Sequence, residues 1–240
     1  MNEKEWKTTI EELVTSYVRD YQKEKGLPDL WRTPLVGYAD ANDSYIQKLP
    51  EIVTDVHKLP QDFMENPKVV ISYFIPFTKA LERTIGGVED NFASKEWADA
   101  YKATNTMMAS LNEYLVQKIR ELGGRAAVTE GIGMLYDVLK SNWSQRHIAY
   151  AAGLGTFGIN NMLITKEGCC GRYNSIVADI PVESISKKRI ACIRARGFVR
   201  NVCRIVSRAR SQQKGSTVAN AMKHVRRIWI YLAWMYAENA

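Results

Sequence analysis

The segment WSQRHIAYAAGLGTFGINNMLITKEGCCG, residues 143–171, concentrates several structural signals within one short stretch. Its pattern predicts a helix over Gln145–Ala152, a glycine-rich turn, a strand over Met162–Thr165 and a tight turn at Glu167–Gly168. A further strand over Ser175–Ala178 is expected to close a hairpin-like unit. Because these elements follow one another so closely, the loop between them is expected to face a ligand.

Glycines punctuate the middle of this segment. Gly153 is placed to end the helix, because glycine readily adopts the left-handed conformation of a C-terminal cap. Gly155 and Gly158 each remove a side chain where the backbone must bend or approach something flat and bulky. Ala149 and Ala152 are small enough for another surface to pack close to the helix. On spacing alone, capping and close packing explain the glycines better than a dinucleotide-binding motif, which requires a preceding strand.

The whole string resembles the AGLGxxGxNxxLI segment of the epoxyqueuosine reductase family and of its relatives, the corrinoid reductive dehalogenases. The match runs from Ala152 to Thr165, and the resemblance extends from about Pro34 to Pro181. It implies an α/β (α+β) domain with a nitroreductase-like core, in which helices pack on a mixed sheet and frame a flat cobalamin. It also implies cobalamin contacts at seven positions of the loop: Gly153, Leu154, Gly155, Thr156, Gly158, Asn160 and Asn161.

A reductase of this kind needs a proton donor beside its substrate, because the anion that reduction generates must be protonated. The resemblance implies an acidic residue shortly before the AGLG string. Asp137 is the nearest acid, although the residues around it depart from the family pattern, and His147 is a second candidate. The structural alternatives are a helix cap for Asp137 and a helical residue with local hydrogen bonds for His147.

The resemblance also implies iron–sulfur clusters. Members of the family continue into a ferredoxin-like domain, whose cysteines bind two [4Fe-4S] clusters that deliver electrons to cobalt. A CxxCxxxC motif is therefore expected soon after Pro181, and the sequence as written lacks it. Without it, turnover would be lost or would need an external electron donor. The chain has four cysteines without metal-ligand spacing, the adjacent pair being typical of small buried side chains: Cys169, Cys170, Cys192 and Cys203.

Charge divides the chain near residue 183. The whole chain carries a formal net charge of +7 and a pI near 9.2. Residues 183–240 hold 13 Lys and Arg against 2 acids, whereas residues 1–182 hold 20 against 24. The basic character therefore belongs to the C-terminal part. We predict a reductase-like domain over 1–182 and an irregular or helical basic tail over 183–240 in place of the cluster-binding domain.

The genetic code suggests an origin for this tail. When the third base of each codon is joined to the first two of the next, Trp234–Met235 must give Asp and Met235–Tyr236 must give Val. The junctions from there to Ala240 permit Asp-Val-Cys-Gly-Lys-Cys, which looks like a cluster motif of the family. Three upstream junctions permit Cys at the CxxCxxxC spacing: Phe198/Val199, Asn201/Val202 and Ile205/Val206. Each junction permits other residues too, but the pattern favours a frameshift near residues 183–190.

Two other function classes remain open. Arg196, Arg200, Arg204 and Arg208 recur at steps of four, which is typical of one basic face of a helix. Such a tail could bind nucleic acid or an anionic membrane surface, and the chain would then be a non-catalytic binding protein. Its apolar end is too short for a membrane span, which takes about 20 residues. A flavin-dependent, nitroreductase-like enzyme is the weaker alternative.

The rest of the chain reads as scaffold. The start, MNEKEWK, mixes charges without an apolar run, so we expect no signal peptide and a cytoplasmic protein, with a small molecule or a modified tRNA as substrate. Hydrophobic periodicity predicts two helices and three strands: Glu3–Lys25, a long helix capped by Ser94 that ends at Leu122, and strands over Pro34–Ala39, Val69–Phe77 and Ala126–Thr129. The buried face of the long helix is expected to include Met107, Leu111, Tyr114, Leu115, Ile119 and Leu122.

Overall fold

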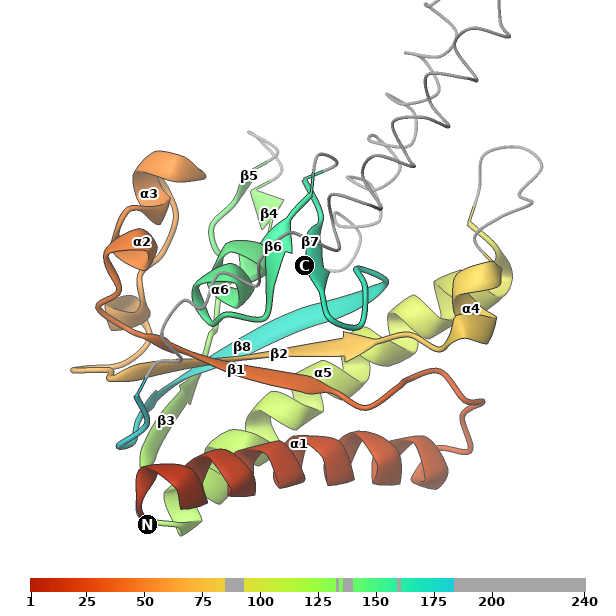
Figure 1. Ribbon diagram of the computed structural model, residues 1–240, viewed down its shortest axis with the longest axis horizontal. Helices are drawn as coiled ribbons and strands as arrows, with labels where there is room; N and C mark the ends of the chain where they lie inside the picture. The colour runs from red at the N-terminus through yellow and green to blue at the C-terminus, as the bar shows by residue number, and fades with distance from the viewer. Residues whose placement is uncertain (85–92, 133, 136–139, 159–160, 184–240) are drawn as a thin grey trace, which may run out of the picture.

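A four-stranded sheet with helices on both faces forms the body of the protein (Figure 1). The computed structural model describes residues 1–84, 93–132, 134–135, 140–158 and 161–183. The sheet contains four strands in the order β1-β2-β8-β3: β1 (Leu35–Asp40), β2 (Val69–Pro76), β8 (Gly171–Asp179) and β3 (Arg125–Val128). The α/β class with helices on a sheet is confirmed.

The expectation of a mixed sheet is wrong, because each neighbouring strand pair of the described sheet is antiparallel. The long helix α5 (Lys95–Glu121) connects β2 to β3, a connection that normally joins parallel neighbours. Here β8 lies between β2 and β3 and pairs with both in the opposite direction. The helical crossover is therefore real, but the strands that it joins are not adjacent.

One face of the sheet is covered by α5 and by α1 (Glu3–Glu24), as Figure 1 shows. Alternate residues of β2 enter this layer and pack against the apolar stripe of α1. The layer includes Val69, Ile71, Tyr73 and Ile75 from β2 and Trp6, Ile10, Val14 and Val18 from α1. The Ser94 hydroxyl accepts a hydrogen bond from the Trp97 amide at 3.1 Å, which confirms the predicted cap. Leu122, predicted to be buried, is 42% exposed because it follows the last helical turn.

The opposite face carries α6 (Gln145–Ala151) and the hairpin of β6 (Gly155–Phe157) and β7 (Leu163–Thr165). Small residues lie in register across the sheet beneath α6, where Gly37 pairs with Ser72 and Ser72 with Ser175. A Cβ at Gly37 would come within 2.5 Å of the Ala152 carbonyl oxygen. The helix therefore packs close to β1, as its alanines predict.

The hairpin differs from the predicted one. Ser175–Ala178 was expected to close a unit with the strand before it, but this segment belongs to β8 and pairs with β2 and β3. The partner of β7 is β6, a three-residue strand within the predicted loop. The β6–β7 hairpin thus projects from the α6 face, apart from the main sheet (Figure 1).

Shorter elements complete the described chain. They are α2 (Ser44–Gln47), α3 (Leu49–Ile52), the 3-10 helix η1 (Pro60–Asp62), α4 (Lys79–Arg83), β4 (Met134–Leu135) and β5 (Lys140–Ser141). Within the described ranges, no helix combines the length and the apolar character that crossing a membrane requires. The predicted basic tail lies outside the described residues apart from its first residue, Glu183.

Candidate functional site

The candidate site is built around the turn that leaves α6. Gly153 has a φ of +75°, the left-handed conformation that the predicted cap requires. The amide of Gly153 donates to the Tyr150 carbonyl and that of Leu154 to the Ala149 carbonyl, both at 3.0 Å, which forms a complete Schellman motif. A Cβ at Gly153 would meet no described atom within 4 Å. The turn therefore presents open backbone directly after the helix.

Two of the predicted contact residues lie inside the protein. A Cβ at Gly155 would come within 2.4 Å of the Ile164 carbonyl oxygen, so the pairing of β6 with β7 requires glycine there. Leu154 is 7% exposed and packs in an apolar cluster with Phe74 and Leu163. Both residues support the turn from within.

The remaining predicted contacts are more accessible. Thr156 and Gly158 are half-buried, and Asn161 is exposed with a φ of +59°. The Arg146 guanidinium, on α6, donates to the Asn161 carbonyl at 2.6 Å and ties the helix to the hairpin turn. Asn160 lies outside the described residues, as does the candidate acid Asp137.

His147 lies beside this turn in a cluster of aromatic rings. Its ring centroid lies 4.8 Å from that of Phe157 and 6.3 Å from that of Tyr45. Its Nδ1 atom lies 2.6 Å from the hydroxyl oxygen of Ser144. Burial lowers the pKa of His147 to about 4, with the positive charge of Arg146 acting in the same direction. At neutral pH the ring is therefore an uncharged hydrogen-bonding group.

A second histidine, which sequence analysis missed, holds the start of α6. His57 is 5% exposed, and its Nδ1 lies 2.6 Å from the Lys58 carbonyl oxygen. Its Nε2 accepts a hydrogen bond from the Ser144 amide at 2.9 Å. Burial lowers the pKa of His57, although the bond to the Lys58 carbonyl opposes the shift. Because His57 and Ser144 lie 87 positions apart, no local pattern signals their contact.

A polar network fixes α6 on the sheet. The Trp143 indole N–H donates to the hydroxyl oxygen of Ser175 at 3.1 Å. That hydroxyl donates to Gln145 Oε1 at 2.8 Å, and the Gln145 amide donates to Asn174 Oδ1 at 2.9 Å. Ser175 is fully buried. These directional bonds set the rotation of the helix, since another rotation would leave buried polar groups unpaired.

The adjacent cysteines lie at the β7–β8 connection. They are half-buried rather than buried, and burial raises the pKa of Cys170 to about 11 and also raises that of Cys169. Both thiols are therefore protonated and weakly nucleophilic at neutral pH. In the described part of the chain, no three His, Cys, Asp or Glu side chains are grouped to hold a metal ion. Cys192 and Cys203 lie outside that part.

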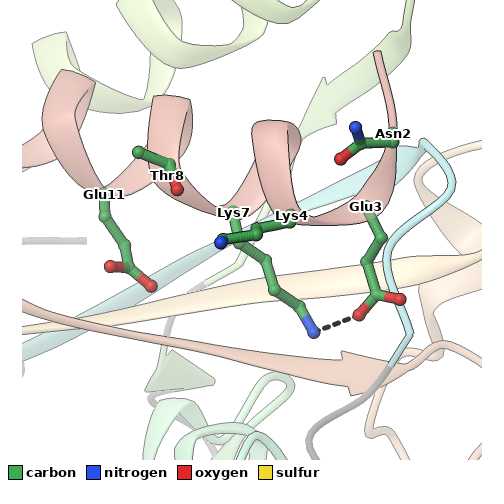
Figure 2. Close-up of a pocket in the computed structure, with 6 residues that line it drawn as sticks. All are labelled: Asn2, Glu3, Lys4, Lys7, Thr8 and Glu11. Carbon is green, nitrogen blue, oxygen red and sulfur yellow. Dashed lines mark hydrogen bonds and ion pairs between the residues drawn. The ribbon is translucent and has the colours of Figure 1, made fainter.

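A shallow surface hollow lies elsewhere, along the first turns of α1 (Figure 2). It is lined by Asn2, Glu3, Lys4, Lys7, Thr8 and Glu11. Glu3 and Lys7 form an ion pair across it. Since α1 covers the other face of the sheet, this hollow is remote from the turn after α6.

The fold is similar to that of solved epoxyqueuosine reductases. The enzyme from Bacillus subtilis, with its catalytic loop swung out of the active site, is 16% identical over 76% of this chain and 49% of that chain, with a TM-score of 0.43. The enzyme from Streptococcus thermophilus is 16% identical over 73% of this chain and 48% of that chain, with a TM-score of 0.41.

A third structure, with an epoxyqueuosine-modified stem loop of tRNA-Tyr, has the same identity, coverage and TM-score as the Streptococcus enzyme. This chain spans about half the length of the solved structures that it matches. No protein-family model and no curated protein matches it. The resemblance to epoxyqueuosine reductases is thus found again in solved structures, as a likeness of fold.

Proposed function

We propose that residues 1–182 form a corrinoid-binding reductase domain of the epoxyqueuosine reductase type. The observation that carries the proposal is the Schellman turn at Gly153, where the AGLG string of the family leaves a stretch of backbone uncovered. The turn lies between the aromatic cluster of His147 and the accessible positions of the β6–β7 hairpin. A flat ligand and its polar side arms would find suitable partners in this arrangement.

The residues present fit a corrinoid. A macrocycle needs a surface without protruding side chains, and the uncovered backbone at Gly153 provides one. Its amide side arms need hydrogen-bonding partners, which the Thr156 hydroxyl and the Asn161 amide offer from accessible positions. A bound corrinoid would supply cobalt-centred electron transfer to the substrate. The neutral His147 ring would hydrogen-bond a ligand at neutral pH rather than protonate it.

The substrate follows from the same proposal. A small reducible molecule or a modified tRNA would be reduced in the cytoplasm, with Asp137 or His147 as the nearest protonatable groups. As written, the chain lacks the cysteine motif for [4Fe-4S] clusters, so an external donor would have to reduce the corrinoid.

The Asn161→Gly variant tests corrinoid binding. Glycine tolerates the left-handed backbone of Asn161, so this change removes the side-chain amide without adding strain. We expect wild-type protein to bind hydroxocobalamin in titrations followed by absorbance, and the variant to bind about tenfold more weakly, the effect of losing one good hydrogen bond.

Asn66→Gly is the matched control, because Asn66 also has a positive φ, of 52°, and is exposed at a distance in sequence. It should bind hydroxocobalamin as the wild type does. Wild-type protein that retains no corrinoid, or that is purified yellow with flavin absorbance, would overturn the proposal in favour of a flavin enzyme or a non-catalytic protein.

We also propose that the basic tail arises from a reading-frame change near residues 183–190. The forced Asp and Val at the junctions after Trp234, together with cysteines permitted at cluster spacing, support it. Sequencing the source gene through codons 175–240 and beyond should reveal a single-base insertion or deletion. An intact frame would contradict the proposal, and tail-dependent binding of RNA or anionic liposomes would then become the hypothesis to test.

A further inference from the structure

His57 stands apart from the loop that sequence analysis singled out, yet it contacts the residue on which α6 begins. We propose that His57 is a positioning residue of the candidate site. As a neutral imidazole protonated on Nδ1, it holds the Ser144 amide and thereby the hydroxyl that orients His147. The inference depends on the proposed function only for which ligand the site binds.

The partners of His57 define its tautomer. A backbone carbonyl can only accept a hydrogen bond, so the nitrogen facing the Lys58 carbonyl at 2.6 Å must carry the proton. A backbone amide can only donate, so the nitrogen facing the Ser144 amide at 2.9 Å must carry a lone pair. The neutral form protonated on Nδ1 satisfies both contacts. The other tautomer and the imidazolium would each direct an N–H at the Ser144 amide.

Ser144 has an unusual role for a serine at the start of a helix. A serine at the N-cap position normally accepts a hydrogen bond from a backbone amide of the first turn. The Ser144 side chain makes no such cap bond, and its hydroxyl oxygen lies 2.6 Å from His147 Nδ1 instead. The residue therefore gives up a stabilising cap and orients a ring. Departures of this kind from local preference are typical of functional positions.

His57 forms one of two parallel links between its loop and the start of α6. The Lys58 amide donates to the Asn142 carbonyl at 2.8 Å, and the Ser144 amide donates back to the His57 ring at 2.9 Å. The His57 ring also lies against Trp143, with centroids 5.5 Å apart. Loss of the imidazole acceptor would leave the Asn142 link in place and release Ser144. The chain would remain folded while the first turn of α6 loosens.

This arrangement leaves one nitrogen of His147 for a ligand. Ser144 occupies Nδ1, and among the described residues no partner is found for Nε2. No side-chain nitrogen or oxygen that is fully buried in the described part of the chain lacks a partner, so Nε2 reaches solvent. His57 and Ser144 therefore determine which nitrogen of His147 is open to a ligand.

The experiment uses the full chain labelled with ¹⁵N, in which three histidines give few ring signals. We expect the ¹⁵N shifts at pH 7 to show His57 protonated on Nδ1 and unprotonated on Nε2. In His57→Phe, which keeps a ring without an acceptor, the Ser144 amide should exchange with solvent at least tenfold faster. The Ile71 amide in the buried strand β2 should be unchanged, and the His147 ring shifts should move.

His57→Gln provides the rescue, because its amide oxygen can reach the place of Nε2 and accept from Ser144. Slow exchange at Ser144 should return in this variant. His57 protonated on Nε2 in the wild type, or Ser144 exchange that is unaffected in His57→Phe, would overturn the proposal. The tautomer measurement needs no variant to fold. Neither measurement involves a corrinoid, so failure of hydroxocobalamin binding alone would contradict only the proposed function.

Discussion

Gly155→Val is expected to destabilise the protein by roughly 3 kcal/mol, the upper part of the range for forcing extra atoms into a packed site. The first added carbon would lie 2.4 Å from the Ile164 carbonyl oxygen and 2.8 Å from its carbon. Both are backbone atoms of β7, so no rotamer change can relieve the contact. The hairpin must open, and the Leu154 side chain beside it must leave its apolar cluster. Urea unfolding followed by circular dichroism measures the loss.

Gly153→Ala is the control for this prediction, since it alters the neighbouring glycine of the same string. Its Cβ would meet no described atom within 4 Å, so the cost is limited to the left-handed backbone, about 1 kcal/mol. The pair thus separates a packing role at Gly155 from an open position at Gly153. Equal losses in the two variants would contradict the close approach of β6 to β7.

Acidification from pH 7 to pH 4 is expected to remove stability that two histidines provide. The pKa of His147 is about 4 in the folded protein and about 6.5 in an unfolded chain. Between these values the unfolded state binds the proton and the folded state does not, so the free energy of unfolding falls as pH falls. The slope is at most about 1.4 kcal/mol per pH unit for each histidine, and solvent screening reduces it. His57 shifts in the same direction.

Urea titrations at pH 7, 6 and 5 measure this dependence. The stability is fully present above about pH 6.5 and is lost as pH falls toward 4. His147→Gln should flatten the profile, and combining it with His57→Gln should flatten it further. His224→Gln is the matched control, since His224 lies outside the described residues. Asp179, whose pKa is lowered by its bonds to Lys68 and Arg125, titrates below this window. An unchanged slope in the double variant would refute the assignment to histidines.

The large helices and the first strands were predictable because their signals are local. The apolar stripe of α1 repeats with helical periodicity, and the predicted end at Lys25 is one residue beyond the observed end at Glu24. The Ser94 cap places the start of α5 for the same reason. The β-prone run at Val69–Pro76 is buried at every position, as a central strand requires.

Strand pairing was less predictable because it depends on contacts far apart in sequence. The glycines around Gly155–Phe157 predict a loop, so the short strand β6 was missed and β7 was assigned the wrong partner. The insertion of β8 between β2 and β3 has no local signal either. A helix between two strands favours a parallel pair, and here that preference was misleading.

The candidate site shows the same division. The helix cap at Gly153 followed from glycine chemistry, and the structure has it. The inward positions of Leu154 and Gly155 depend on where β7 packs, which no motif encodes. His57 was missed because a histidine between ordinary loop residues gives no sign of the amide that it contacts from 87 positions away.

The strand order has a consequence for how the protein is made. During synthesis β2 emerges long before β8, so one edge of a strongly hydrophobic strand stays without its partner until residue 179 has left the ribosome. A chain interrupted earlier would expose an edge prone to aggregation. All four strands of the sheet, however, precede residue 183. A ribosome that changed frame after that point would therefore already have delivered a complete sheet.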